Sequence, residues 1–465
     1  MTAQLEKGLA AAYESPAEQS ALDHLWIHQA NWVDLAERQG LHVFERGEGI
    51  YLYDVHGRRY IDAMAGLLVV NVGHGRGELA DASAEQMRKL AYVSSANYTS
   101  VPAAELSAKI AELTPGDLER VFFSSGGSEA IETAIKIVKQ VQFLRGFPKR
   151  YKIIARRGGY HGATFGAMSL TSNRAETEPL FGPFMHGVSH VSTIDHYRND
   201  FGDNSEEGDL LAARAVEQEI RFQGPETVAA VIGEPISVSA GCHVPSKDYW
   251  RRLRRICDHY GVLLIMDEVI NGWGRTGKLF ATEHFGMVPD VMTMAKGLSS
   301  GYAPIAATVV APSLYAEFQQ EGRYLAHLLT FGGHAVSCAV ALKNIEIIQR
   351  ERLVENSAQM GDYLLAGLQR LVQVHPSVGD ARGKGLMCGL ELVRDKETRE
   401  RWGKNHAFIQ RLGQELDRAG MLLRILDVLV IAPPLVITRE QVDDILTILD
   451  DALTTVEGEF GLRAN

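Results

Sequence analysis

The sequence lacks the residues and runs that define several large classes of protein. It holds only 4 cysteines in 465 residues, with no Cys-x-x-Cys pair, so neither a zinc site nor a disulfide framework is indicated. Its longest apolar stretches, such as 262–266 and 303–311, are far shorter than the roughly 20 residues of a membrane-spanning helix. The first residues lack the basic and apolar regions of a signal peptide. These absences favour a cytoplasmic protein that does not enter membranes.

Basic charge is also scarce. The chain has 47 Lys and Arg against 58 Asp and Glu, and its formal net charge of -11 leaves no basic footprint for nucleic acid. Hydrophobic residues make up 46% and charged residues 23%, which is typical of a globular protein. A chain of this length can bury a large core without disulfide or metal cross-links.

Two glycine motifs of nucleotide-binding enzymes are missing. No Gly-x-Gly-x-x-Gly turn follows a candidate strand, which argues against a nicotinamide dehydrogenase. The phosphate loop of ATPases, Gly-x-x-x-x-Gly-Lys followed by Ser or Thr, is absent as well, because neither Gly277-Lys278 nor Gly383-Lys384 continues into a hydroxyl residue.

What the chain does contain is an alternation of short apolar strands and amphipathic helices. The segments 49–54 and 59–62 flank the turn dipeptide His56-Gly57 and predict a β-hairpin. The segment 22–39 is predicted to be partly helical. Strands are predicted at 121–123, 151–155, 228–233, 263–266, 291–294 and 306–310, with helices at 128–144, 210–223 and 247–260. The pattern indicates an α/β fold with a wound, mostly parallel sheet.

After about residue 330 the pattern of predicted helices and strands changes. It predicts helices at 335–350, 356–374, 407–419 and 440–457, with strands at 385–392 and 429–432. We therefore expect an N-terminal segment, 1–80, that contributes to a small domain, a large domain at 81–330, and a smaller C-terminal α+β domain at 331–465. The acidic stretch 199–209 is predicted to be a solvated loop.

Chemistry is expected where the strands of such a sheet end, because ligands collect at their carboxyl edge. The first strand leads into Ser125-Gly126-Gly127-Ser128 and a helix, which favours a phosphate held by backbone N–H groups. A plain turn capped by a serine is the alternative. The second strand leads into Tyr160, which lies close to glycines and could cover the planar ring of a ligand. A tyrosine packed in a glycine-rich loop is the alternative.

The next three strands end in charged residues. Glu234 and Asp267 each follow an apolar strand, where a carboxylate is costly to bury unless it is paired or caps a helix. Lys296 follows the third strand in apolar company, which destabilises its ammonium form and makes it a candidate Schiff-base nucleophile. A solvated lysine is the alternative. Together the five strand ends fit one cofactor, pyridoxal phosphate, which needs a lysine, a carboxylate at its ring nitrogen, a ring cover and a phosphate cradle.

The combination resembles the class III, or omega, aminotransferases among the fold-type I pyridoxal-phosphate enzymes. The resemblance runs from about residue 26 to 457. It rests on the motifs Ser-Gly-Gly-Ser-Glu-Ala at 125–130, Gly-Tyr-His-Gly at 159–162, Gly-Glu-Pro at 233–235, the run 264–277, Ala-Lys-Gly at 295–297, Thr-Phe-Gly-Gly-His at 330–334, and Ala-Pro-Pro-Leu at 432–435. Members of this family are expected to be homodimers with shared active sites, and dimers that pair into tetramers remain open.

The resemblance implies roles for the residues that match it. Lys296 is implied to be the Schiff-base lysine and the base that moves a proton, and Asp267 the partner of the ring nitrogen. The implied contacts of the cofactor ring and its surroundings are Tyr160, Val269, Glu234 and His161. The implied phosphate ligands are Ser125, Gly126, Gly127, Ser128 and, from the second subunit, Thr330.

The resemblance also implies a substrate pocket. Arg424 matches an arginine that pairs with the substrate carboxylate in the pyruvate-using branch, although an exposed loop arginine is the alternative. Leu68 stands where amine–pyruvate enzymes usually carry tryptophan, so a larger amine is expected to fit. Tyr98 is expected to form an aromatic wall of the same pocket.

The sequence therefore predicts a pyridoxal-phosphate aminotransferase that moves an amino group from an amine or omega-amino acid to a keto acid, with pyruvate as the expected acceptor. Racemase, decarboxylase and aminomutase reactions on the same scaffold remain alternatives, since all of them use the lysine and the aspartate. A non-catalytic binding protein is a more distant alternative, because such a protein would need neither residue.

Overall fold

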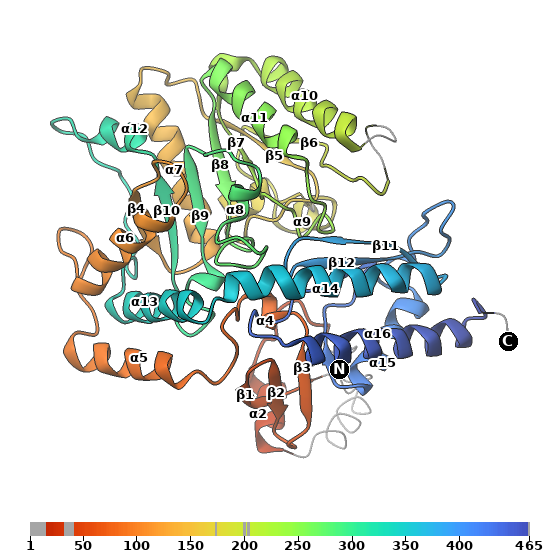
Figure 1. Ribbon diagram of the computed structural model, residues 1–465. Helices are drawn as coiled ribbons and strands as arrows, with labels where there is room; N and C mark the ends of the chain where they lie inside the picture. The colour runs from red at the N-terminus through yellow and green to blue at the C-terminus, as the bar shows by residue number, and fades with distance from the viewer. Residues whose placement is uncertain (1–14, 32–40, 173, 199–200, 202–204, 464–465) are drawn as a thin grey trace.

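The computed structural model describes residues 15–31, 41–172, 174–198, 201 and 205–463. A mixed sheet of seven strands lies at its centre (Figure 1). The strands run in the order β4 (Arg120–Ser124), β10 (Ala306–Val310), β9 (Val291–Met294), β8 (Leu263–Asp267), β7 (Val228–Gly233), β5 (Lys152–Arg156) and β6 (Val188–Val191). Only β10 runs antiparallel to its neighbours. The mostly parallel sheet predicted from the sequence is confirmed.

Both faces of this sheet are covered by helices. Along β8, Leu263 and Ile265 belong to one apolar cluster, whereas Leu264 and Met266 belong to another, because successive side chains of a strand point to opposite faces. The first cluster includes side chains of α7 (Gly127–Leu144) and the second includes side chains of α11 (Lys247–Tyr260). The apolar strands therefore serve a buried sheet, as their composition predicted.

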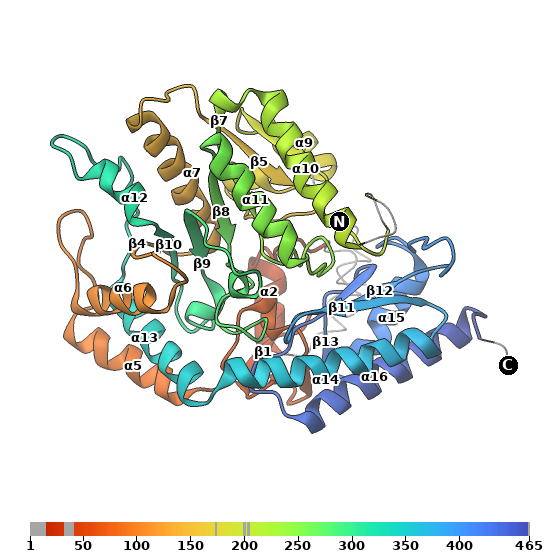
Figure 2. The same ribbon diagram turned by 45° about the horizontal axis from the view of Figure 1, so that its top comes forward.

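The two ends of the chain meet beside this sheet. β1 (Phe44–Glu48), β2 (Tyr51–Asp54) and β3 (Arg59–Asp62) form the predicted hairpin region, and β13 (Met421–Leu422) pairs in parallel with β3. A second small sheet consists of β11 (Val378–Gly383), β12 (Cys388–Leu392) and β14 (Val428–Ile431). The long helices α14 (Leu353–Val374) and α16 (Arg439–Glu459) run side by side below it (Figure 2).

The remaining helices pack around these sheets and the long helices. They are α2 (Pro16–His24), α4 (Ala65–Leu68), α5 (Gly77–Lys89), α6 (Val101–Leu113), α8 (Phe165–Leu170), α9 (Arg174–Phe181), α10 (Ser205–Gln223), α12 (Pro312–Tyr315), α13 (Ala335–Arg350) and α15 (Ala407–Arg418). Short 3-10 turns occupy η1 (Pro225–Thr227), η2 (Ala281–His284), η3 (Lys296–Leu298) and η4 (Ala316–Phe318). No helix in the described ranges is long and apolar enough to cross a membrane.

Local signals explain where several helices begin and end. The Ser246 hydroxyl accepts a hydrogen bond from the Tyr249 N–H at the start of α11, and Gly261, at φ +64, ends that helix in the left-handed conformation. Thr438 starts α16 with a reciprocal capping box. By contrast, α7 begins at Gly127 after Gly126 and has no side-chain cap, so its first N–H groups are left for another partner.

The segment 22–39, expected to be partly helical, contains the end of α2 at His24 and continues without helix over 25–31; residues 32–40 lie outside the described residues. One sequence prediction needs correction. The loop expected at 199–209 gives way to α10 at Ser205, where a serine followed by acidic residues is a helix-start signal. Asp209 is buried rather than solvated, and its carboxylate accepts bonds from the His196 ring and the Ser246 N–H.

Candidate active site

The predicted site residues gather at one edge of the central sheet. β5, β7, β8 and β9 are parallel, so their carboxyl ends lie together, and these ends lead into Tyr160, Glu234, Asp267 and Lys296. β4, which leads into Gly126 and α7, points the same way because two antiparallel pairings separate it from β9. Parallel pairing alone thus brings together residues that are far apart in the chain.

Asp267 lies at the centre of a buried hydrogen-bond network. One carboxylate oxygen is 2.8 Å from the His161 Nδ1, and the other accepts bonds from the Val269 N–H at 3.0 Å and the Thr293 hydroxyl at 3.2 Å. Asp267 is 4% exposed and His161 is 3% exposed. These three partners fix the plane of the carboxylate, which a group that must hold one ligand atom requires.

His161 bridges two carboxylates. Burial alone would lower its pKa, but the nearby Glu234 and the hydrogen bond to Asp267 outweigh burial and raise it. Burial likewise opposes the charge of Glu234, but His161 and Arg156 together lower the pKa of that carboxyl. The His161 Nε2 is 3.9 Å from Glu234 and makes no hydrogen bond among the described residues. The network therefore favours an imidazolium at His161, with its Nδ1 next to Asp267.

Lys296 lies in the turn that follows β9. Its backbone adopts φ +45, a conformation that a non-glycine residue rarely takes, so the surrounding structure must hold it there. Burial lowers the pKa of Lys296 to about 8, and the positive charge of Arg275 acts in the same direction, while Asp267 opposes it. Among the described residues its Nζ makes no hydrogen bond or ion pair. The amine is therefore free to react, and a large share of it is neutral near pH 8.

The start of α7 forms a cradle for an anion. A Cβ added at Gly127 would lie 2.9 Å from a methyl carbon of Val269, and one added at Gly162, at φ +134, would overlap the Ser128 hydroxyl. That hydroxyl accepts a bond from the Ala163 N–H, so its own proton is available to a ligand. The uncapped N–H groups and this hydroxyl suit a phosphate, which fits the cofactor predicted from the sequence.

The residues predicted to face the ring, the substrate or a partner subunit differ in exposure. Tyr160 is 45% and Tyr98 is 68% exposed, while Thr330 and Arg424 are exposed as well. Arg424 lies between β13 and β14 and makes no ion pair with a described residue. Leu68 is only 3% exposed, within the apolar cluster that includes Met64, so a wider pocket at this position stays a prediction.

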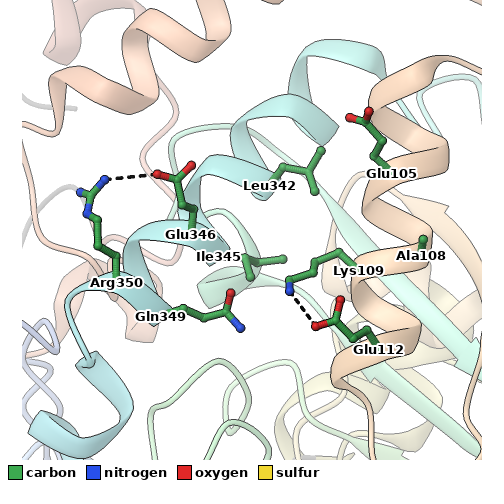
Figure 3. A pocket seen from close by; sticks show the side chains of 9 residues that line it. All are labelled: Glu105, Ala108, Lys109, Glu112, Leu342, Ile345, Glu346, Gln349 and Arg350. Atoms are coloured by element: carbon green, nitrogen blue, oxygen red, sulfur yellow. Dashed lines mark hydrogen bonds and ion pairs between the residues drawn. The ribbon is translucent and has the colours of Figure 1, made fainter.

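A groove elsewhere on the molecule contains none of these residues. It has a volume of about 730 Å³ and is lined by side chains of α6 and α13 (Figure 3). Four of its five charged side chains are paired, with Lys109 2.9 Å from Glu112 and Arg350 3.2 Å from Glu346, and Glu105 is the fifth. It offers no set of unpaired polar groups that converge on one point.

Two supporting residues were not predicted from the sequence. Arg156 ends β5, is 3% exposed, and donates to the backbone oxygen of Glu234 while its guanidinium lies 5.0 Å from the ring centre of Trp250. Thr293 lies within β9 and reaches Asp267 across the sheet. An arginine directly after an apolar run is a signal that could have revealed Arg156, whereas Thr293 needs the register of the two strands.

Glu268, next to Asp267, is a fully buried carboxyl. It accepts hydrogen bonds from the N–H groups of Ala281 at 3.1 Å and Thr282 at 2.7 Å, and also from the Thr282 hydroxyl. It thereby caps η2 and ties the segment after β8 to residues 281–282. Burial raises the pKa of Glu268 to about 7, although these three hydrogen bonds act against the shift.

This raised pKa gives a prediction for stability. Between about pH 4.5 and 7 the folded protein keeps a proton on Glu268 that the unfolded chain releases, so rising pH should cost the wild type on the order of 3 kcal/mol of unfolding free energy. Glu268→Gln removes this titration. Urea unfolding of both proteins at several pH values should show the wild type losing stability relative to the variant as pH rises. Parallel curves would contradict the assignment.

Comparisons with known proteins agree with this geometry. The family model of class-III aminotransferases matches residues 33–453. The taurine–pyruvate aminotransferase of Bilophila wadsworthia is 39% identical over 461 residues, covering 96% of this chain and 99% of its own. The putrescine–pyruvate aminotransferase of Pseudomonas aeruginosa is 39% identical over 415 residues, covering 88% and 90%. The crystal structure of an (S)-enantioselective omega-transaminase from Thermomicrobium roseum superposes with a TM-score of 0.92 at 41% identity, covering 96% and 99%.

The fold and the match to this structure define an α/β enzyme of fold-type I. The chain belongs to the class-III aminotransferase family, whose cofactor is pyridoxal phosphate. The predicted fold class, enzyme class and cofactor are thereby confirmed.

Proposed function

We propose that this aminotransferase moves an amino group from an amine or omega-amino acid to pyruvate. The observation that carries the proposal is the convergence of Lys296, Asp267 and the cradle of α7 at one sheet edge. Pyruvate is favoured as the acceptor because the relatives from Bilophila wadsworthia and Pseudomonas aeruginosa both bear it in their names. Their donors differ, taurine in one and putrescine in the other, so the donor of this chain is left as a class.

Each proposed role follows from the environment of the residue. Pyridoxal phosphate, when bound, supplies an aldehyde that condenses with amines and a ring that withdraws electrons from the substrate carbon. Lys296 would hold the cofactor covalently through its Nζ and, once released, would move a proton from the substrate carbon, which its neutral form suits. Asp267, backed by His161, would hold the protonated ring nitrogen.

The other predicted residues would bind and orient. The residues proposed to hold the phosphate are Ser125, Gly126, Gly127, Ser128 and Thr330 of a second copy. Tyr160 and Val269 would enclose the ring, with Glu234 beside it. Arg424 would pair with the carboxylate of pyruvate, since a planar guanidinium binds a carboxylate with two bonds, and its lack of a partner in the described residues supports that role.

We also propose that the enzyme is a homodimer. Thr330 lies in a loop that exposes large apolar side chains, with Tyr324 72%, Leu328 60% and Phe331 60% exposed. Such a cluster is typical of a surface that another chain covers.

We further propose a cytoplasmic location and a division into an N-terminal segment, 1–80, a large domain, 81–330, and a small domain, 331–465. The pairing of β13 with β3 supports the joining of both chain ends.

The proposal is tested by measuring alanine formation from pyruvate with a panel of donors. We expect activity with (S)-1-phenylethylamine above (R)-1-phenylethylamine, the preference of the similar enzyme from Thermomicrobium roseum, and with at least one of taurine, putrescine and β-alanine. Leu68→Trp is the comparison variant, and we expect it to disfavour the bulkier aromatic donor, with some loss of stability because Leu68 is buried. No alanine from any donor would contradict the proposed reaction, and an unchanged donor profile in L68W would contradict the role of Leu68.

A further inference from the structure

A fully buried arginine lies behind the turn that carries Lys296. Arg275 is 0% exposed, yet no described carboxylate lies within ion-pair distance of it. Its Nη1 donates to the backbone oxygens of Leu386 at 3.1 Å, Ala432 at 3.1 Å and Pro433 at 2.5 Å. Because a buried charge without an ionic partner costs several kcal/mol, an arginine held only by neutral oxygens calls for a function.

Arg275 reaches the lysine turn through Asn71. Its Nη2 donates to the Asn71 Oδ1 at 2.6 Å, and the Asn71 Nδ2 donates to the backbone oxygen of Trp273 at 2.9 Å. The amide of Asn71 is packed directly on Gly297, where an added Cβ would overlap its Nδ2. The amide is therefore fixed from three directions, and it in turn closes one side of the turn that begins at Lys296.

The opposite side of this turn is held as well. The Asn344 Nδ2, on α13, donates to the backbone oxygens of Gly297 at 2.8 Å and Leu298 at 3.0 Å. A turn gripped from both sides can keep Lys296 at its unfavourable φ of +45. The contacts made by Asn71 and Arg275 differ from those made by Asn344, because Arg275 carries a charge and Asn344 does not.

We propose that Arg275 and Asn71 are positioning residues for Lys296: Arg275 holds the Asn71 amide, and that amide packs on Gly297 and fixes the turn that begins at Lys296. The positive charge of Arg275 also acts against the ammonium form of the lysine. The inference rests on the proposed role of Lys296. The charged groups that face this lysine are Asp267, which favours the ammonium, and Arg275, which disfavours it. Asp267 is itself backed by His161 and Glu234, and the charge that acts on Arg275 is that of Asp62, which favours the guanidinium.

The proposal is tested on the cofactor-free protein by the pH dependence of Lys296 acetylation. Acetic anhydride reacts with the neutral amine, and mass spectrometry of the Lys296 peptide gives the rate at each pH. We expect a midpoint at about pH 8 for the wild type. Arg275→Met should raise this midpoint by roughly one pH unit. Arg275→Lys, which keeps a charge but loses the planar fork, should move the midpoint less than Arg275→Met does.

Asn71→Asp tests the same idea without a change of volume. The new carboxylate would lie against the guanidinium and neutralise it, so the midpoint should again rise. Arg150→Met is the control, because Arg150 also donates to backbone oxygens, those of Tyr260 and Gly261, but at the opposite end of β8. Its midpoint should equal that of the wild type.

The outcomes separate the inference from the proposed function. Unchanged midpoints in Asn71→Asp and in folded Arg275→Met would overturn the role of the guanidinium, even if alanine formation falls. If Arg275→Met does not fold, Arg275→Gln, which also removes the charge but keeps polar atoms for the backbone oxygens, takes its place. Failure of the aminotransferase assay with a shifted midpoint would overturn the proposed function but leave the effect on the lysine standing.

Discussion

Replacing Lys296 with alanine is expected to reduce transamination by roughly 10³-fold or more, because the residue is proposed both to hold the cofactor and to move the substrate proton. Its Nζ is the amine that the structure leaves without a partner beside Asp267. The wild type, loaded with cofactor and reduced with borohydride, should yield a Lys296 peptide that carries the added mass of the cofactor. The variant should yield no such peptide.

Lys139→Ala is the matched control for this variant. Lys139 is also partly buried, and burial lowers its pKa too, but it lies on α7 beside the sulfur of Met185, away from the sheet edge. We expect the control to keep wild-type activity and the modified Lys296 peptide. Label on another lysine in the wild type, or full activity in Lys296→Ala, would show that the assignment is wrong.

Replacing Asp267 with asparagine is expected to lower the turnover number by roughly 10²- to 10³-fold, the usual cost of removing one preorganised charge from a reacting centre. Asparagine keeps the shape and can still accept from the Val269 N–H, but it cannot balance a protonated ring nitrogen. The pKa of His161 should also fall, because Glu234 would still raise it but the charge of Asp267 and the hydrogen bond to that carboxylate would be lost. Steady-state kinetics with a donor and pyruvate give the turnover number.

Asp290→Asn is the comparison for this second prediction. The Asp290 carboxylate accepts from the Leu264 N–H at 2.7 Å and pairs with Arg254 at 2.7 Å, which places it near the amino end of β8. It serves the same strand as Asp267 without touching the site. We expect a loss of stability but a near-normal turnover number in the folded fraction. Equal losses of turnover in both variants would mean that Asp267 supports the fold rather than the chemistry.

The sheet and the strand ends could be predicted because their signal is local. Each long apolar run forms a strand. Because the strands are mostly parallel, the residues at their carboxyl ends, such as Asp267 and Lys296, lie at the same edge of the sheet. β6 was not predicted, since its four residues, Val188–Val191, include a serine and a histidine and lack an apolar run. The start of α10 was predicted to be a loop because acidic residues in a row are typical of solvent-exposed segments.

The contacts that tune the site could not be predicted from local patterns. The three oxygens bound by the Arg275 Nη1 come from two segments more than a hundred residues further along the chain, and no backbone oxygen has a sequence signature. The placement of His161 between two carboxylates likewise depends on three different strands. By contrast, the glycines of 126–127 could be recognised because they stand as a pair between a predicted strand and a predicted helix.

The most direct test of the central claim is the absorption spectrum of the purified protein loaded with pyridoxal phosphate. An amine donor is added first and pyruvate second. We expect the yellow colour of the lysine-bound cofactor to bleach with the amine and to return with pyruvate, which would show both halves of an amino-group transfer at one site. A yellow protein that no donor bleaches would contradict transamination and favour another reaction on this scaffold. A protein that stays colourless with the cofactor would contradict the role of Lys296.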